Sequence, residues 1–398
     1  MNTVQEKIST PIKEECDVFV AGGGFAGIAS ALSAAREGKR VIMAERLFML
    51  GGLATSGLIT IYLPLCDGYG KQVSFGIAEE LLRLSIALHN DGKLGVSTWI
   101  DGVGEKNEKT PRFQANFNPQ LFAIQAEQLL IENGVKIIYG ASVAGASVEN
   151  GKIAAVILEG KSGRYAVKAK SYVDCTGDCD LANQAGAPTE LFGQGNILAA
   201  WYYSFGDDGF NLHKMGASDT PDEEKKVGKA GAELLVNRRF AGIEDDEISD
   251  FVKLSHEKVL EDFKKRKVND AAYEPTTIAT MPQLRMTRRI AGEYTLTTPE
   301  MHKFFPDSVG LVSDWKKRGP VYEVPFGTLY SKEIKNLICA GRITSVDDAM
   351  WDIMRVIPCC AVTGEAAGLA AAMSDDFTSI DIVKLQEKLT ERGVVLHE

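Results

Sequence analysis

A glycine-rich turn between two short apolar runs constrains the fold of this chain more than any other feature. Residues 18–45 read VFVAGGGFAGIASALSAAREGKRVIMAE, and the run over 17–21 indicates a buried strand. A small-residue helix follows the turn and ends near Glu37, and RVIMAE over 40–45 indicates a second strand. This order and these lengths are typical of a βαβ unit, whose strands are parallel. The sequence therefore predicts an α/β fold with helices packed on a parallel sheet.

The turn itself has the spacing G-x-G-x-x-G, formed by Gly22, Gly24 and Gly27. Between a strand and a helix, the first glycine permits a tight turn and the second lets the backbone approach a pyrophosphate. The third lets the helix pack closely on the strand. Glu45 ends the next strand about 20 residues on, where a carboxylate accepts hydrogen bonds from a ribose. The pattern favours a dinucleotide site over a glycine-rich turn that binds nothing.

Later segments bear on which dinucleotide is bound. ERLFMLGGLATSG carries the pair Gly51 and Gly52 soon after the first motif, CTGD follows a strand at 175–178, and NLICAGRITS ends a strand at Gly341. A nicotinamide-binding dehydrogenase would share the first motif but would have no use for the glycine pair or the TGD segment. DGVGEKN over 101–107 has glycines but no apolar helix after it, so we expect no separate nicotinamide domain.

The middle of the chain predicts a helix and then short strands. NPQLFAIQAEQLLIENG over 118–134 has Asn118 as a helix cap and Gly134 as a stop signal. Three short strands follow, with turn signals at 150–151 and 160–163. We expect an antiparallel β-meander inserted into the parallel sheet.

Taken together, these segments resemble a largely bacterial family known as FAD-dependent oxidoreductases, which have the Rossmann-like fold of glutathione reductase. Six stretches occur in the family's order: LGGLATSGLI, GIAEELL, VDCTGDCDLANQAGAP, QLRMTRRIAGEY, VPFGTLYSKEIKNLICAGR and RVIPCCAVTGEAAGLAAA. The resemblance implies FAD as the cofactor. It also implies a discontinuous FAD domain over 1–192 and 321–398 with the inserted meander, and an α+β substrate or cap domain over 193–320. The family's substrates are poorly defined.

The motifs and the resemblance together assign FAD contacts along the chain. They are Gly22, Gly24, Phe25, Ala26, Gly27, Glu45 and Arg46; Gly51, Gly52, Ala54 and Thr55; Val143, Thr176, Gly177 and Asp178; and Gly341, Arg342, Arg355, Val356 and Ile357. Asp178 could equally be a plain cap of a short helix that stops at Gly186. The free N–H groups of the helix that begins near Val356 would face the flavin, where a positive helix end favours reduction.

Two positions depart from the family's pattern. Many members carry a histidine in the loop after the A-G-R segment, where this chain has Asp348, and many carry D-x-H before the VPFG strand. This chain has SDWKKRG there, with Asp314 and no histidine. If those histidines serve catalysis in the relatives, this protein has altered that chemistry or lost it.

Composition limits the partners that we expect. The formal net charge of the 398 residues is −10, so the chain lacks the basic footprint that nucleic acid requires. The polar start, MNTVQEKISTPIKEECD, has no apolar core of a secretory signal, and no apolar run reaches the ~18 residues of a membrane span. We expect a cytoplasmic protein with a small-molecule substrate, no membrane partner and no nucleic acid.

The cysteines and histidines give no sign of a metal site. Seven cysteines and five histidines are scattered, without a C-x-x-C pair, which predicts neither zinc nor a disulfide framework. Cys359 and Cys360 fall in the first turn of the last small-residue helix, where Pro358 is also tolerated. We expect this cysteine pair to serve packing.

Three arginines are the candidate catalytic residues: Arg288, Arg342 and Arg355. In a helix, Arg285 and Arg289 would share one face with Arg288 beside it, able to bind an anionic substrate or the flavin edge. A solvated basic patch or structural ion pairing is the equal alternative for these residues. Arg342 and Arg355 flank the last motif and are the better candidates to lie near the flavin.

We therefore expect a flavin-dependent oxidoreductase that transfers a hydride between a small organic substrate and flavin N5. The arginines would orient an oxygen or stabilise charge. The alternative is an FAD-binding protein whose flavin is structural or serves a non-redox role, such as RNA modification or assembly with a partner.

Overall fold

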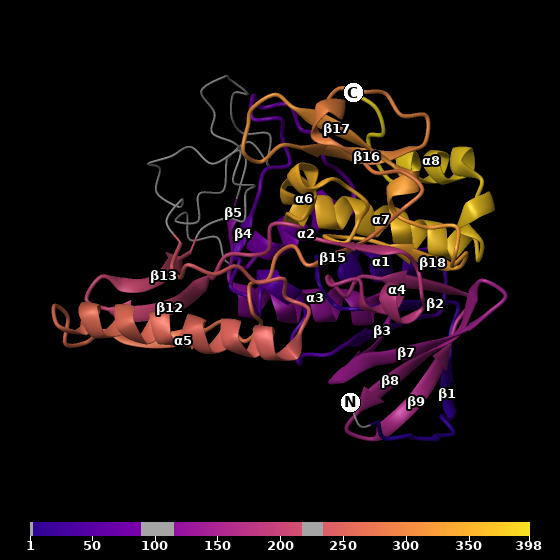
Figure 1. The fold of residues 1–398 in the computed structure, drawn as a ribbon. Helices are drawn as coiled ribbons and strands as arrows, with labels where there is room; N and C mark the ends of the chain where they lie inside the picture. Colours follow the sequence, from indigo (N-terminus) through magenta and orange to yellow (C-terminus); the bar gives the residue numbers. More distant parts are fainter. Residues whose placement is uncertain (1–2, 89–114, 217–233) are drawn as a thin grey trace.

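A five-stranded parallel sheet forms the centre of the molecule (Figure 1). The structure, a computed structural model, describes residues 3–88, 115–216 and 234–398, so the glycine segment 101–107 lies outside the described residues. The strand order is β18-β10-β2-β3-β6, with β2 at Val18–Ala21, β3 at Val41–Glu45, β6 at Lys136–Tyr139, β10 at Ser171–Asp174 and β18 at Leu337–Cys339.

The chain changes direction across this sheet between β2 and β10. From β2 it runs to β3 and β6 on one side, and β10 and β18 then pair in parallel on the other. In open α/β sheets, ligands bind outside the carboxyl ends of the strands at such a switch point. The glycine turn after β2 lies at that edge.

Two helices, α1 (Phe25–Arg36) and α7 (Ile357–Met373), pack against each other with almost no side chain between them. A Cβ on Gly368 would lie 2.1 Å from the carbonyl oxygen of Ser30, and one on Gly364 would lie 2.4 Å from that of Ala26. The hydroxyl of Ser30 donates to the carbonyl oxygen of Gly364 at 2.9 Å. The small-residue sequence of α7 therefore serves close contact with α1.

The meander forms a second sheet below the first (Figure 1). It consists of β7 (Ala141–Glu149), β8 (Lys152–Gly160) and β9 (Gly163–Lys168), with β1 (Ile12–Glu15) parallel to β9 at the edge. Asn150 and Gly151 both have positive φ, 52° and 72°, as an Asn-Gly hairpin turn requires. The predicted meander is confirmed.

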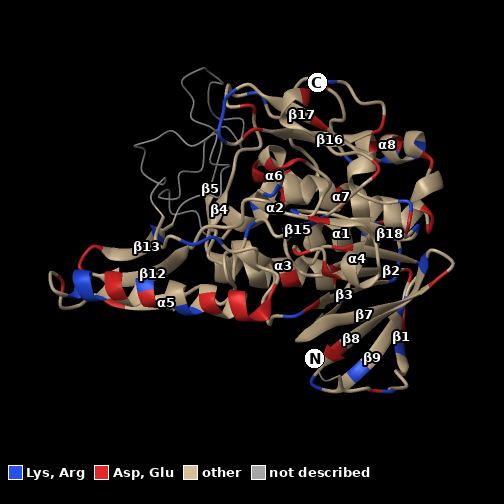
Figure 2. Ribbon diagram, in the orientation of Figure 1, with Lys and Arg blue, Asp and Glu red and all other residues tan. Residues whose placement is uncertain are grey.

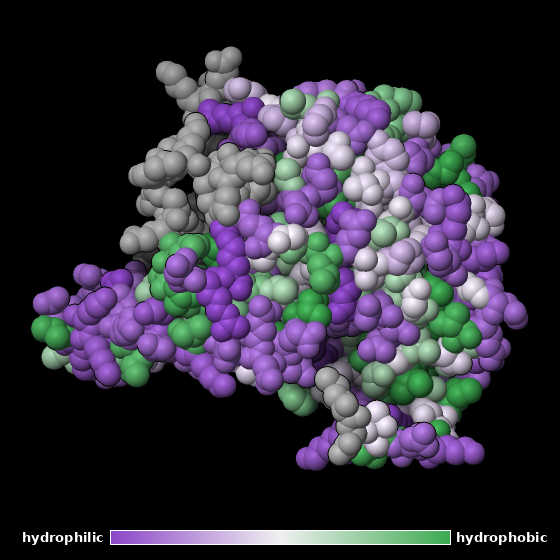
Figure 3. Space-filling model, viewed as in Figure 1, coloured by the Kyte–Doolittle hydropathy of each residue, from purple (hydrophilic) through white to green (hydrophobic). Residues whose placement is uncertain are grey.

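A separate arm projects from the body (Figure 1). It is built from β12 (Ala200–Gly206), β13 (Gly209–Met215), β14 (Glu274–Ile278) and α5 (Asp245–Lys267). Acidic residues gather at the start of α5 and basic residues at its end (Figure 2), and hydrophilic residues dominate the visible face of the arm (Figure 3). Phe251 and Val259 are the buried residues of α5. This arm supplies the expected α+β part of the fold.

The other elements surround these parts. They are β4 (Ile61–Tyr62), α2 (Ile77–Ile86), β5 (Ala115–Asn116), α3 (Pro119–Glu132), α4 (Asp180–Gln184), β11 (Thr189–Leu191), β15 (Arg288–Ile290), β16 (Ser308–Ser313), β17 (Val321–Pro325), α6 (Asp348–Met354) and α8 (Ile382–Glu391). Asn118 caps α3, accepting from the N–H groups of Gln120 and Leu121 at 3.0 Å each. The predicted cap is thus confirmed.

The division into domains at 192/193 and 320/321 stays a prediction. Residue 320 lies between β16 and β17, which pair with each other, and Met286, Phe305 and Val309 belong to the same buried cluster as α1 and α7. The C-terminal part of 193–320 therefore packs with the body rather than with the arm.

Among the described residues, no single helix is long and apolar enough to cross a membrane. Only α6 and α7 taken together reach that length and composition, and they are bent by 87° where they meet.

The α1–α7 contact makes a direct prediction for Gly368→Ala. Alanine favours an isolated helix by about 1 kcal/mol over glycine. At this position, however, the new Cβ would overlap the carbonyl of Ser30, so we expect a net loss of about 2–4 kcal/mol in the free energy of unfolding. Chemical denaturation measures this value, and an unchanged or increased stability would contradict the packing described.

Glu365 predicts a pH dependence of stability. Its carboxylate is buried in α7 and accepts from the N–H of Ile77 at 2.8 Å. Burial raises its pKa from 4.5 to about 7, although the Ile77 hydrogen bond and the charge of Arg392 oppose the rise. Because the native state holds this proton more tightly, the resulting stabilisation is complete below about pH 4.5 and is lost as pH rises through about 7.

The expected loss is on the order of 3 kcal/mol, at about 1.4 kcal/mol per pKa unit. Glu365→Gln cannot titrate, so its free energy of unfolding should fall less between about pH 5 and pH 8 than that of the wild type. Urea denaturation across this range measures both slopes. Equal slopes would show that Glu365 is ionised in the native protein.

Candidate functional site

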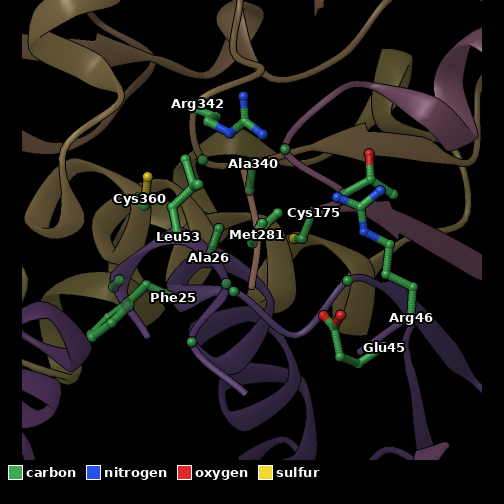
Figure 4. A pocket seen from close by; sticks show the side chains of 18 of the residues that line it. Phe25, Ala26, Glu45, Arg46, Leu53, Cys175, Met281, Ala340, Arg342 and Cys360 are labelled. Carbon is green, nitrogen blue, oxygen red and sulfur yellow. The ribbon is translucent and has the colours of Figure 1, made fainter. Parts of the chain in front are cut away.

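A cavity opens at the carboxyl ends of the parallel strands, and Figure 4 shows it from close by. Most of the predicted FAD contacts line it: Gly22, Gly24, Phe25, Ala26, Glu45, Arg46, Gly51, Gly52, Ala54, Val143, Thr176, Gly177, Gly341, Arg342, Arg355 and Ile357. Segments that are far apart in the sequence therefore meet at one site. The predicted contacts that do not line the cavity are Gly27, Thr55, Asp178 and Val356.

The three motif glycines have different reasons to lack a side chain. Gly22 has a φ of 98°, and a Cβ there would lie 2.4 Å from the carbonyl oxygen of Cys175. A Cβ on Gly27 would lie 1.9 Å from the carbonyl oxygen of Gly22. Gly24 lines the cavity, and its Cβ would meet no protein atom within 4 Å. Gly22 and Gly27 thus hold the fold, whereas Gly24 leaves room for a ligand.

The N-terminus of α1 faces the space in the cavity that Gly24 leaves open. Its first hydrogen bond runs from the N–H of Ile28 to the carbonyl oxygen of Gly24 at 2.9 Å, so the N–H groups of Phe25, Ala26 and Gly27 precede the helical pattern. The ring of Phe25 turns away and stacks on Phe122, with ring centroids 4.4 Å apart. The backbone therefore offers N–H groups and a positive helix end to an anion such as a pyrophosphate.

The Glu45 carboxylate is fixed at the other end of the cavity from Arg342 (Figure 4). One oxygen accepts from the N–H of Gly23 at 2.7 Å and the other from the N–H of Leu47 at 2.8 Å. Each carboxylate oxygen can accept a further hydrogen bond. The arrangement fits the predicted role of accepting from ribose hydroxyls.

The second glycine turn is held by a side chain outside the cavity. Gly51 and Gly52 have φ values of 102° and 57°, and the N–H of Gly51 donates to the carbonyl oxygen of Gly23 at 2.8 Å. The hydroxyl of Thr55 donates to the carbonyl oxygen of Leu50 at 2.6 Å. Thr55 therefore supports the turn rather than lining the cavity.

Arg342 is a buried cation on the cavity wall. Its Nη2 donates to Asp178 at 2.8 Å, and the hydroxyl of Thr287 donates to the same carboxylate oxygen at 2.8 Å. Nη1 is buried and has no partner among the described residues. A buried N–H without an acceptor is costly, so this nitrogen fits an oxygen of a bound ligand.

The alternative role of Asp178 as a helix cap is wrong. Helix α4 begins at Asp180, after Cys179 in a left-handed conformation with φ 59°. Other side chains satisfy its start: Thr176 accepts from the N–H of Asp180, and Asp174 accepts from that of Ala182, both at 2.9 Å. Asp178 is consequently free to hold Arg342.

Arg355 lies on the wall between α6 and α7. Its Nε donates to Asp352 at 2.9 Å, and its Nη2 also bonds this carboxylate. Val356 is the extended residue before α7, and Pro358 occupies the first turn, as the sequence predicts. The start of α7 and the guanidinium of Arg355 thus give this part of the cavity a positive potential.

The arginines at 285–289 do not share a helix face. Residues 288–290 form β15, which pairs antiparallel with β11, so Arg288 and Arg289 point to opposite faces. Arg289 pairs with Glu190, while Arg288 lies 3.9 Å from Asp180 and outside the cavity. The helical expectation for this segment is wrong, because strand pairing across the sequence overrides its helical spacing.

The two family departures also lie outside the cavity lining. Asp348 lies at the start of α6, and burial raises its pKa, with a hydrogen bond from the backbone of Gly193 acting against that rise. Asp314 is buried in the loop after β16, where it accepts backbone N–H groups.

Sequence reasoning missed part of the lining: Ala44, Leu53, Ala141, Ser142, Cys175, Asp180, Met281, Ala340 and Cys360. Met281 comes from the segment between β14 and β15. Its N–H donates to the carbonyl oxygen of Ser56 at 3.1 Å, which holds this segment beside the turn at Gly51 and Gly52. Burial raises the pKa of Cys360 to about 12, so it is a neutral thiol. Cys360 therefore lines the cavity, whereas Cys359 is buried in packing as expected.

One buried cluster outside the lining has potential metal ligands. Asp174, Cys179 and Cys339 bring ligand atoms within 4.8 Å of one another. The Asp174 carboxylate already accepts the N–H groups of Thr176 and Ala182 and the hydroxyl of Thr176. These hydrogen bonds commit the Asp174 carboxylate to the segment at the start of α4, so it is not a ready metal ligand.

A family comparison agrees with this geometry. The model of the family described as FAD dependent oxidoreductase matches residues 17–199 and 238–389, which is most of the chain. The chain therefore belongs to the FAD-dependent oxidoreductases, and its cofactor is FAD. The predicted family, cofactor and Rossmann-type α/β fold are confirmed.

Curated relatives match shorter parts. A protein named "probable electron transfer flavoprotein-quinone oxidoreductase" from Escherichia coli (strain K12) is 28% identical over 157 residues, 37% of this chain and 33% of its own length. Thioredoxin reductase of Ureaplasma parvum serovar 3 is 30% identical over 76 residues, 19% of this chain and 25% of that protein. This chain thus spans a third or less of these relatives.

Solved structures give more distant likenesses. A geranylgeranyl bacteriochlorophyll reductase-like protein from Thermoplasma acidophilum has a TM-score of 0.46 at 15% identity, covering 96% of this chain and 84% of that one. The flavin-dependent brominase Bmp2 has a TM-score of 0.44 at 12% identity, covering 95% and 83%. The family assignment rests on the family match.

The different roles of the motif glycines can be separated by mutation. Gly24→Ala places a methyl group in the cavity without a clash, so it should weaken FAD binding by about 10-fold or more while unfolding stability stays within about 0.5 kcal/mol. Gly27→Ala places its methyl against Gly22 and should lower stability itself. Fluorescence titration with FAD and thermal denaturation measure the two effects, and full FAD affinity in Gly24→Ala would contradict this assignment.

Proposed function

We propose that this FAD-dependent oxidoreductase transfers a hydride between a carbon of a small organic substrate and flavin N5. The observation that supports this most is the continuous cavity from the ribose-binding carboxylate of Glu45 to the cations Arg342 and Arg355. Its length brings together every motif that the sequence connects with FAD. Apolar Leu53 and Met281 line it between Arg342 and Glu45 (Figure 4).

When bound, FAD supplies the hydride acceptor or donor. The residues of the chain bind the cofactor, orient the reacting groups and stabilise charge. The N–H groups at the start of α1 bind the pyrophosphate, and Glu45 accepts from the ribose. Arg342, held by Asp178, orients an oxygen through its Nη1, and Arg355 with the start of α7 stabilises negative charge that develops during reduction.

Unlike Arg342 and Arg355, Arg288 does not line the cavity, and we assign it an indirect role. It lies behind Asp180, a cavity residue whose pKa is raised to about 6 by burial and by Asp178 and Asp174. We propose that it moderates the charge of Asp180 and does not touch the substrate. A small-molecule substrate, a cytoplasmic location and the lack of a membrane partner remain part of the proposal. The acidic net charge supports the further proposal that nucleic acid is not a partner.

Anaerobic mixing tests the proposed reaction. The FAD-loaded protein would be mixed with a panel of small alcohols, amines, hydroxy acids and unsaturated acids while the absorbance of oxidised flavin is followed. Bleaching by a member of the panel, or reoxidation of the dithionite-reduced protein by one, is the expected result. A bound flavin that dithionite cannot reduce would favour the structural role of FAD instead.

Arg342 and Arg288 form a matched pair of variants. Arg342→Met removes a buried donor that faces the cavity, so FAD affinity should fall about 10- to 100-fold, the range for a charge-assisted hydrogen bond. Arg288→Met removes the same charge outside the cavity and should change the affinity by less than about threefold. Isothermal titration of both variants measures this contrast, and equal losses would contradict the placement of Arg342.

A further inference from the structure

The loop between β16 and β17 contacts α6 behind the cavity. The indole N–H of Trp315 donates to the carbonyl oxygen of Asp352 at 2.8 Å. Asp314, buried in the same loop, accepts from the backbone N–H of Lys316 at 2.7 Å and fixes the turn. These two contacts place the side chain of Lys316 beside α6. The loop is the SDWKKRG segment that departs from the family's pattern.

The Asp352 carboxylate lies between two cations. One oxygen accepts from Nε and Nη2 of Arg355, and the other lies 3.1 Å from Nζ of Lys316. Asp352 is completely buried, while the side chains of Lys316 and Arg355 are 15% and 9% exposed. Burial alone would raise the pKa of Asp352, but the charges of Arg355 and Lys316 lower it, so it is ionised at neutral pH.

This pairing decides how Arg355 is presented to the cavity. A guanidinium that donates through Nε and Nη2 to one carboxylate is fixed in orientation. Removing Lys316 would take one cation away from the buried carboxylate and leave its bonds from Arg355 in place. The three side chains together carry two positive charges and one negative charge.

We propose that Lys316 and Asp352 are positioning residues for Arg355, and that this trio sets how strongly the protein favours reduced over oxidised FAD. The inference rests on the proposed function, because it requires FAD in the cavity that Arg355 lines. Reduction adds negative charge to the flavin, and nearby protein charge tunes the balance between its two redox forms. Lys316 and Asp352 therefore act in opposite directions.

The test compares four variants by titrating each FAD-loaded protein with dithionite against a reference dye, which gives the midpoint potential. Lys316→Met removes a positive charge, so the ratio of affinities for reduced over oxidised FAD should fall about 3- to 10-fold. Asp352→Asn removes a negative charge and should raise the ratio. The double variant should lie near the wild type. Lys317→Met, at the exposed next position in the loop, is the matched control and should differ by less than about twofold.

If Lys316 and Asp352 served only to hold the fold, their variants would bind both redox forms of FAD more weakly. The ratio of the affinities for reduced and oxidised FAD would then stay unchanged. The proposal is overturned if Lys316→Met and Asp352→Asn shift the midpoint in the same direction, or if neither shifts it while FAD stays bound. Should Asp352→Asn fail to fold, Lys316→Met and the double variant still decide. A wild-type protein that takes up no FAD would overturn the proposed function itself, which is a different result from an unshifted variant.

Discussion

Close contact between α1 and α7 is the constraint on which the rest of the structure depends. The backbones meet at Gly364 and Gly368, where no Cβ fits, and the Ser30 hydroxyl bonds across the contact. Because the helices are locked together, their N-termini open on the same cavity at the carboxyl edge of the sheet. In the proposed mode of binding, the start of α1 meets the pyrophosphate, and the start of α7 directs its positive end at the far part of the cavity.

Charged groups around the cavity follow one pattern. Two of the cations on the wall, Arg342 and Arg355, have a carboxylate behind them: Asp178 for Arg342 and Asp352 for Arg355. A buried ion pair contributes little net stability but fixes geometry, so these carboxylates orient the guanidinium groups toward the ligand. Thr287 and Lys316 then hold the carboxylates from a third segment of the chain. The acidic chain thus presents two oriented guanidinium groups at the site.

Features with local causes were predictable from the sequence, and those with distant causes were not. The positive φ of Gly22 and the Asn118 cap follow from neighbouring residues. Local sequence made Asp178 an equal candidate for a helix cap, but Arg342, 164 residues away, takes its carboxylate. The helical spacing at 285–289 likewise gives way to the pairing of β15 with β11. Cys360 reaches the cavity only through the packing of α7, which local spacing does not encode.

We propose that the helix starts and the β2 turn form one site that holds FAD along its whole length. A crystal structure of the FAD-loaded protein tests it most directly. We predict density for the pyrophosphate at the N-terminus of α1 beside Gly24, for the ribose at Glu45, and for the flavin ring system between Leu53 and the start of α7. Density for FAD outside this cavity, or for a flavin ring remote from Arg355, would contradict the account.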